Sequence, residues 1–244
     1  MEFRFLHVYP DLMSLYGSYA NVSILKRYLE DLGHAVTVEA VRPGEPVHLA
    51  GADFLYMGAG TERSQKAAAA DFARCGEDVK AAAADGMPML FAGTALELLG
   101  ASVTDGGGET YPGLGLAEFT SVQGKQRIVG DVYGSTDLYA APVVGFMNKC
   151  ALLRGVETPL LTACALGFGN EAEGGPEGFH RDHVFGSELT GPILVKNPRL
   201  LEAVAAAVCG RRGAEVPAQP PIGRWQEAGY AITAEQLRLR CPGT

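Results

Sequence analysis

The sequence lacks three features that would place it at a membrane, on nucleic acid or outside the cell. None of its apolar stretches reaches the roughly 18 residues that a membrane-spanning helix needs. Lys and Arg form no cluster, and the formal net charge of −8 argues against a nucleic-acid-binding surface. No secretory signal pattern precedes the strand-like segment at 3–9. We therefore expect a cytoplasmic protein.

Cysteine patterns for disulfides or zinc are also missing. The five cysteines have no C-x-x-C spacing and are scattered over the chain at Cys75, Cys150, Cys164, Cys209 and Cys241. This predicts reduced thiols and no metal site. The phosphate-binding motifs G-x-G-x-x-G, with its later acidic residue, and G-x-x-x-x-G-K-[ST] are absent too. We therefore expect no nucleotide and no other cofactor.

The first hundred residues alternate between strand-like and helix-like patterns. Apolar runs predict strands at 3–9, 35–41, 54–57 and 89–92. Helical periodicity or an Ala-rich composition predicts helices at 21–32, within 62–84 and from 95 onward. This order is typical of an α/β protein with a mostly parallel central sheet and helices on both faces.

Beyond residue 101, glycine-rich turns separate shorter apolar segments. These segments predict short antiparallel strands around 128–134, 143–147, 160–164 and 183–186. A helix is expected at 198–209 and another at 233–240. We predict one domain over 1–210 and a tail, 211–244, that packs on this domain or on a partner protein.

The segment around Gly93 predicts a sharp turn between a strand and a helix. Met89–Ala92 is a short buried strand, and Gly93-Thr94 forms the turn. Such an elbow holds a catalytic nucleophile clear of the sheet in many α/β hydrolytic enzymes. It needs a backbone conformation that strains any residue except glycine. Gly93 suits the turn but offers no nucleophilic side chain.

A series of motifs resembles class I glutamine amidotransferases of the cobyric-acid-synthase-like (CobB/CobQ) branch. Within that branch it resembles the glutaminase subunits of lipid II isoglutaminyl synthases (GatD type). In chain order the shared segments are Leu15-Tyr16-Gly17 with Asn21, 58–65, 85–88, 113–116, Arg127 with Gly130-Asp131, 145–148, 167–170 and 186–197. The resemblance implies a flavodoxin-like α/β fold, with some antiparallel strands in the second half.

The resemblance also implies a catalytic arrangement that this sequence only partly keeps. In that family an elbow cysteine attacks glutamine, a late histidine transfers the proton, and backbone N–H groups of a Gly-rich loop bind the oxyanion. Here the nucleophile position is Gly93, the base position is Thr190, and Glu97 stands where glutamine is usual. The loop Gly58-Ala59-Gly60 and the substrate-positioning Arg127 are retained as ligand-binding candidates.

These substitutions predict a glutamine-amidotransferase-like pseudoenzyme in peptidoglycan precursor (lipid II) amidation. The resemblance implies a heterodimer with a Mur-ligase-like protein. Two alternatives stay open. One is an active amidotransferase or hydrolase with a relocated nucleophile, Cys150 or Thr94. For Thr94, the candidate bases His180 and His183 lie near the base position Thr190 in the sequence. The other is a sensor that binds glutamine or another small amino acid through Arg127.

Overall fold

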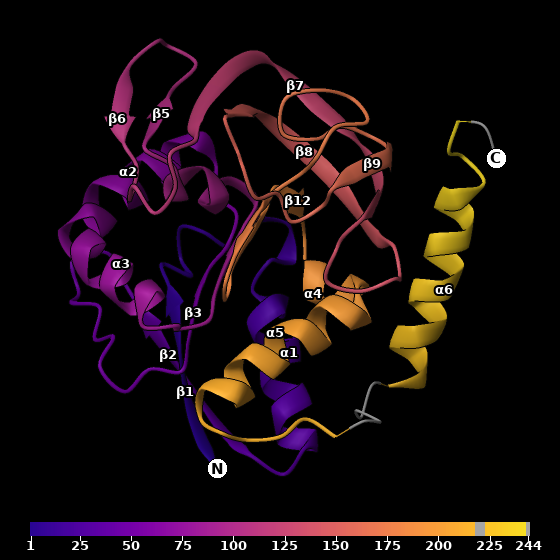
Figure 1. The fold of residues 1–244 in the computed structure, drawn as a ribbon. Helices are drawn as coiled ribbons and strands as arrows, with labels where there is room; N and C mark the ends of the chain where they lie inside the picture. Colours follow the sequence, from indigo (N-terminus) through magenta and orange to yellow (C-terminus); the bar gives the residue numbers. More distant parts are fainter. Residues whose placement is uncertain (218–222, 243–244) are drawn as a thin grey trace.

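The computed structural model describes residues 1–217 and 223–242, and its centre is a six-stranded, mostly parallel sheet (Figure 1). The rest of the predicted tail, residues 218–222 and 243–244, lies outside the described residues. Neighbouring strands are parallel except for the edge strand β10, which is antiparallel to β11. In spatial order the strands are β10 (Phe179–Arg181), β11 (Val184–Ser187), β4 (Met89–Ala92), β3 (Phe54–Met57), β1 (Glu2–Val8) and β2 (Ala35–Val41).

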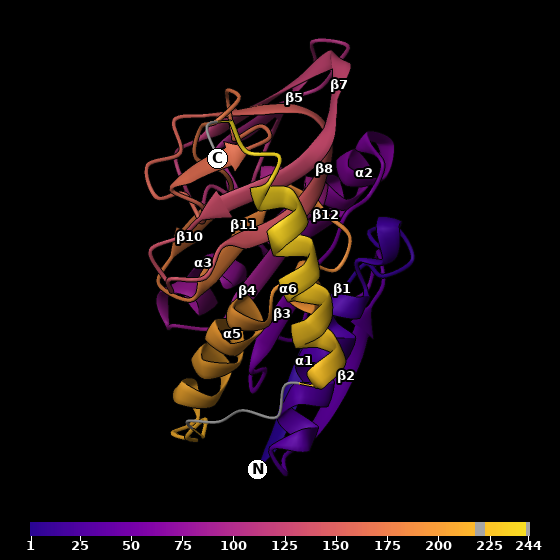
Figure 2. The ribbon, with the colours of Figure 1, turned by 90° about the vertical axis from the view of Figure 1, so that its right-hand side faces the viewer.

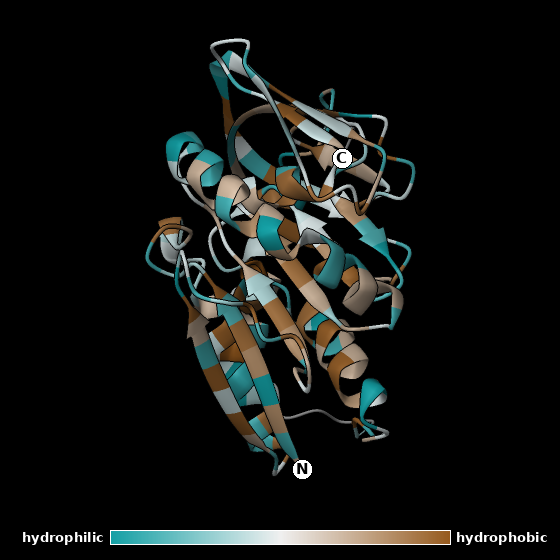
Figure 3. Ribbon diagram, turned by 90° about the vertical axis from the view of Figure 1, so that its left-hand side faces the viewer, coloured by the Kyte–Doolittle hydropathy of each residue, from teal (hydrophilic) through white to brown (hydrophobic). Residues whose placement is uncertain are grey.

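Helices cover both faces of this sheet because alternate strand residues point to opposite sides. On one face, Phe5 and Phe54 share a buried cluster with α1 (Ala20–Asp31) and α5 (Pro198–Arg211). On the other face, Leu6 and Leu55 share a second cluster with α2 (Glu62–Phe72) and α3 (Gly76–Ala84). Largely hydrophobic strands therefore lie between helices that carry hydrophilic segments (Figure 3).

The predictions for the first hundred residues are confirmed, with one correction. The strands expected at 35–41, 54–57 and 89–92 match β2, β3 and β4 residue for residue. Residues 62–84 form α2 and α3, joined by the 3₁₀ turn η2 (Ala73–Cys75). The α-helix expected from residue 95 is wrong, because the chain winds as a 3₁₀ helix, η3 (Gly93–Leu99), that begins at the turn glycine itself.

A second, mainly antiparallel sheet follows, and its strands are longer than the sequence predicts. Its long strands are β7 (Thr120–Ser135, 16 residues) and β8 (Val143–Arg154, 12 residues). The remaining strands are β12 (Leu189–Thr190), β5 (Ser102–Thr104) and β6 (Thr110–Pro112), with β9 (Ala163–Leu166) paired to β7. Gly145 lies inside β8, where another chain segment approaches closely: a Cβ on Gly145 would lie 2.7 Å from Leu189. The segment expected at 183–186 is β11. It lies in the central sheet, antiparallel to β10 as expected on one side and parallel to β4 on the other.

The last helix is also longer than predicted. It is α6 (Arg224–Arg238), whereas the sequence predicted a helix at 233–240. Contacts with α4 (Ile193–Lys196), α5, β7 and β8 hold α6 along the outside of the domain (Figure 2). These tertiary contacts stabilise the first turns of α6, which the sequence pattern around Gly229 does not favour. Among the described residues, no helix is both long and apolar enough to cross a membrane.

Candidate active site

The carboxyl ends of three neighbouring parallel strands bring the predicted site residues together. In the register of the sheet, Met57 of β3 pairs with Phe91 of β4, and Ala92 of β4 pairs with Ser187 of β11. The 58–60 loop, the Gly93 turn and the segment that leads to Thr190 therefore leave the sheet at the same edge. This edge is where ligands bind in open α/β sheets.

Gly93 and Ala59 are packed against each other at this edge. Gly93 has φ +61°, a left-handed conformation that favours glycine. A Cβ added to Gly93 would lie 2.5 Å from the Cβ of Ala59, which is closer than two carbon atoms can approach. Because Ala59 is itself only 2% exposed, it has little room to move away. The methyl group of Ala59 therefore occupies the space into which a nucleophilic side chain at position 93 would extend.

Thr94 joins the elbow to the 58–60 loop through two hydrogen bonds. The Thr94 hydroxyl accepts a hydrogen bond from the Gly60 N–H at 2.9 Å and donates one to the Gly60 carbonyl at 3.2 Å. The Ala59 N–H donates to Ser18 Oγ at 3.4 Å. The Ala59 and Gly60 N–H groups, which the sequence predicts as oxyanion donors, are thus both bonded within the protein. The Thr94 hydroxyl is committed to the backbone, and neither of its partners is a base.

Thr190 has a structural partner of its own. Its hydroxyl donates to the Phe146 carbonyl at 2.9 Å, next to the backbone pairing of β12 with β8. Thr190 cannot act as the proton-transferring group that a histidine would be. His183 does not replace it, because its carbonyl bonds the N–H of Met89 at the amino end of β4, the opposite end of the sheet from Gly93.

Arg127 lies on β7 and is held by two neighbours. Its Nη1 donates to Glu62 Oε1 at 2.8 Å, and its Nε donates to Asn148 Oδ1 at 2.7 Å. Asn148 in turn donates to the Tyr16 hydroxyl at 3.0 Å. The Arg127 side chain is 43% exposed, so a ligand could reach it, but it would compete with Glu62.

Cys150 shares the same carboxylate. Its thiol donates to Glu62 Oε1 at 3.3 Å. Burial, together with the hydrogen bond and negative charge of Glu62, raises the pKa of Cys150 to about 12. A thiol is nucleophilic as the thiolate, and this environment opposes its formation at neutral pH.

The sequence reasoning missed a buried charged cluster beside the elbow. Lys149 and Glu188 are 3% and 2% exposed and form an ion pair, and Lys149 also donates to the Gly169 carbonyl at 2.8 Å. Burial raises the pKa of Glu188 to about 8, and Oε1 of this carboxyl has no hydrogen-bond partner among the described residues. The signal that could have revealed Lys149 is its place between Met147 and Ala151, where it points to the same buried side of β8.

Glu97 is buried in a second polar network below the turn. Its Oε2 accepts from Ser121 Oγ at 2.6 Å and from Gln123 Nε2 at 3.0 Å. Burial raises the pKa of Glu97. Gln65 ties this network to the elbow, because its Nε2 donates to the Thr94 carbonyl at 2.8 Å. Glu97 therefore helps to stabilise the conformation of the elbow through this network. Among the described residues, no group of His, Cys, Asp and Glu is placed to hold a metal ion.

Comparison with known proteins identifies the family and the fold of this chain. Residues 4–198 match the family described as the CobB/CobQ-like glutamine amidotransferase domain. The sequence is 27% identical over 219 residues to lipid II isoglutaminyl synthase (glutamine-hydrolyzing) subunit GatD of Staphylococcus aureus (strain N315), covering 90% of this chain and 88% of that protein. It is 30% identical over 203 residues to the subunit of the same name from Streptococcus pneumoniae (strain ATCC BAA-255 / R6), covering 82% and 77%. A crystal structure of a glutamine amidotransferase superposes with a TM-score of 0.52 at 19% identity, covering 84% of this chain and 98% of that one, which shows a shared fold.

Proposed function

Because the chain belongs to the CobB/CobQ-like glutamine amidotransferase family, we propose that it is a glutaminase-like subunit in lipid II amidation that does not hydrolyse glutamine itself. We infer the role in lipid II amidation from the two relatives, which both bear the name of an isoglutaminyl synthase subunit. We infer the loss of glutaminase chemistry from the residues of this chain.

The packing of Ala59 against Gly93 carries the proposal. Removing the nucleophile or its base from a catalytic unit costs about 10⁶ in kcat, and removing both costs little more because they act together. This factor corresponds to roughly 8 kcal/mol of transition-state stabilisation. The 58–60 loop cannot compensate, because the Gly60 N–H is bonded to Thr94 and the Ala59 methyl group fills the nucleophile's space.

We further propose that the chain works through a Mur-ligase-like partner, which it stabilises, gates or supplies with free ammonia. Support comes from large apolar side chains exposed beside the site. Leu15, Tyr16 and Tyr19 are 38%, 49% and 56% exposed. They belong to the segment that contacts the 58–60 loop through a hydrogen bond from the Leu15 N–H to the Ala59 carbonyl at 2.9 Å. Exposed apolar side chains grouped at one place are typical of a protein–protein contact.

The test is ammonia release from glutamine by the purified protein, alone and co-expressed with a Mur-type ligase. We expect the no-enzyme background in both cases, together with co-purification of the ligase. Replacement of Tyr16 and Tyr19 by Ser should weaken that co-purification, whereas replacement of the exposed Val129 by Ser should not. Turnover above background, or failure of the chain to associate with any ligase of this class, would contradict the proposal.

The relocated-nucleophile alternative has a direct test. If turnover is found, Cys150→Ala or Thr94→Ala should abolish it. The geometry disfavours both candidates, because Thr94 is bonded to the Gly60 backbone and the Cys150 thiol is held protonated by burial and Glu62. For the sensor alternative, calorimetry with millimolar glutamine should show binding that Arg127→Met removes.

A further inference from the structure

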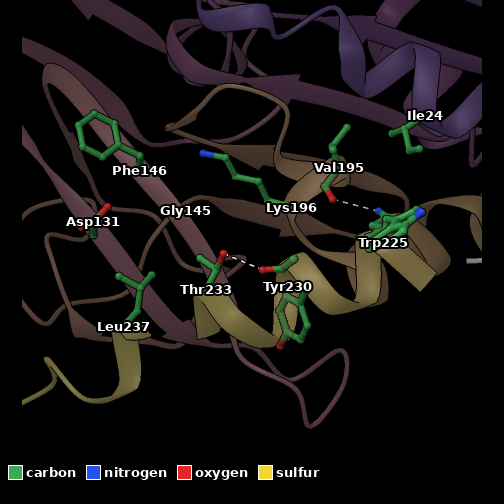
Figure 4. A pocket seen from close by; sticks show the side chains of 12 residues that line it. Ile24, Asp131, Gly145, Phe146, Val195, Lys196, Trp225, Tyr230, Thr233 and Leu237 are labelled. Atoms are coloured by element: carbon green, nitrogen blue, oxygen red, sulfur yellow. Dashed lines mark hydrogen bonds between the residues drawn. The ribbon is translucent and has the colours of Figure 1, made fainter. Parts of the chain in front are cut away.

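A pocket of about 540 Å³ lies between α6 and the body of the protein, and none of the predicted site residues lines it. Its walls are mostly apolar, formed by Ile24, Phe146, Val195, Trp225 and Leu237 (Figure 4). This volume lies within the range of about 300–1,000 Å³ that is typical of small-molecule sites.

Lys196 supplies a cation to this otherwise apolar space. Its side chain extends from α4 into the pocket, with the amine on the side of Phe146 and Asp131 (Figure 4). Within residues 1–217 and 223–242, the ammonium group makes no hydrogen bond and no ion pair, and burial lowers its pKa. Asp131 lines the same end of the pocket but is already paired with Arg240. The charge of Asp131 attracts the Lys196 cation, but no described residue hydrogen-bonds to the ammonium group, so its donors can bind an anion that enters the pocket.

Gly229 keeps the α6 wall of the pocket open. A glycine in the interior of a helix costs about 1 kcal/mol relative to alanine. Gly229 has no positive φ, and a Cβ added to it would meet nothing within 4 Å. Neither backbone conformation nor packing thus requires a glycine here. Its effect is to leave space in the pocket wall.

The wall itself is well anchored. Gln226 Nε2 donates to the Val195 carbonyl at 3.0 Å, and the Tyr230 hydroxyl donates to the Pro142 carbonyl at 2.7 Å. These hydrogen bonds fix the side chains of Gln226 and Tyr230, both of which line the pocket. The two hydrogen bonds therefore hold α6 in place as one wall of the pocket.

We propose that this pocket binds a small carboxylate with an apolar chain or ring, the carboxylate contacting Lys196 and the apolar part lying against Trp225 and the face of α6. A monoanion fits better than a dianion because Lys196 is the one cation among the described residues that line the pocket, and the Asp131 carboxylate lies at the same end. The proposal is independent of glutamine chemistry and of a ligase partner.

The test uses the intrinsic fluorescence of Trp225, the only tryptophan of the chain, which is 76% exposed at the pocket. Octanoate should produce a saturable blue shift at millimolar concentration or below. Lys196→Met removes a charge-assisted hydrogen bond and should weaken octanoate binding at least about tenfold. The same variant should leave the weaker binding of octanol unchanged.

A second variant locates the site. Gly229→Leu places a bulky side chain in the pocket and should weaken the response to octanoate and octanol, while raising helix propensity and so preserving the fold. The matched control is Gly210→Leu in α5, a helix glycine with open space around it that does not line the pocket. The proposal is overturned if octanoate gives no saturable shift, if Lys196→Met binds octanoate as the parent protein does, or if Gly229→Leu leaves the response intact.

Discussion

The close packing of Gly93 and Ala59 predicts a large, coupled loss of stability when a side chain is placed at the elbow. Gly93→Ala would hold a Cβ at φ +61°, which costs about 1–2 kcal/mol. The overlap with the Ala59 methyl at 2.5 Å adds about 1–3 kcal/mol of overpacking. The free energy of unfolding should therefore fall by about 2–5 kcal/mol. For a chain of this size the expected drop in Tm is roughly 4–20 °C.

A double-mutant cycle separates the two contributions. Adding Ala59→Gly to Gly93→Ala removes the overlapping methyl group and should recover the stability lost to overpacking. The two substitutions should therefore show a coupling energy of about 1–3 kcal/mol in urea denaturation. Gly115→Ala is the matched control, because Gly115 has φ +64° but open space around its Cβ position. It should show the backbone cost alone. The reasoning is refuted if the two elbow substitutions are additive within about 0.5 kcal/mol, or if Gly93→Ala costs no more than Gly115→Ala.

Three further outcomes follow from the site. Thr94→Val should lower the free energy of unfolding by about 1–3 kcal/mol because it leaves the Gly60 N–H without its partner, whereas Thr94→Ser should cost less; urea denaturation of both variants checks this. Because burial raises the folded-state pKa of Glu188 to about 8, the folded protein binds more protons than the unfolded chain between its ordinary pKa and that value. The free energy of unfolding should therefore fall as pH rises from about 5 to 8, and Glu188→Gln should flatten this slope in denaturation curves recorded across that range. Iodoacetamide should modify Cys150 on the order of 10²-fold more slowly than a free thiol at pH 8, as followed by peptide mass spectrometry, and Glu62→Gln should speed the reaction; an unchanged rate would show that Glu62 does not protect the thiol.

The sequence determined the elements of the first hundred residues because their signals are local. The strand Met89–Ala92 and its turn glycine can be identified from neighbouring residues, as can the order of motifs from which Gly93 and Thr190 are predicted to stand at the catalytic positions. The family and the fold class follow from that order.

Only the tertiary structure decided which side chains fill the candidate site, because those contacts join residues far apart in the chain. Ala59 meets Gly93 across two strands, Lys149 of β8 pairs with Glu188 after β11, and α6 closes a pocket against Lys196. A sequence pattern reports the period of an element but not the side chains that it will meet. The same limit applies to the strand glycine Gly145, because only the structure shows the close approach of Leu189.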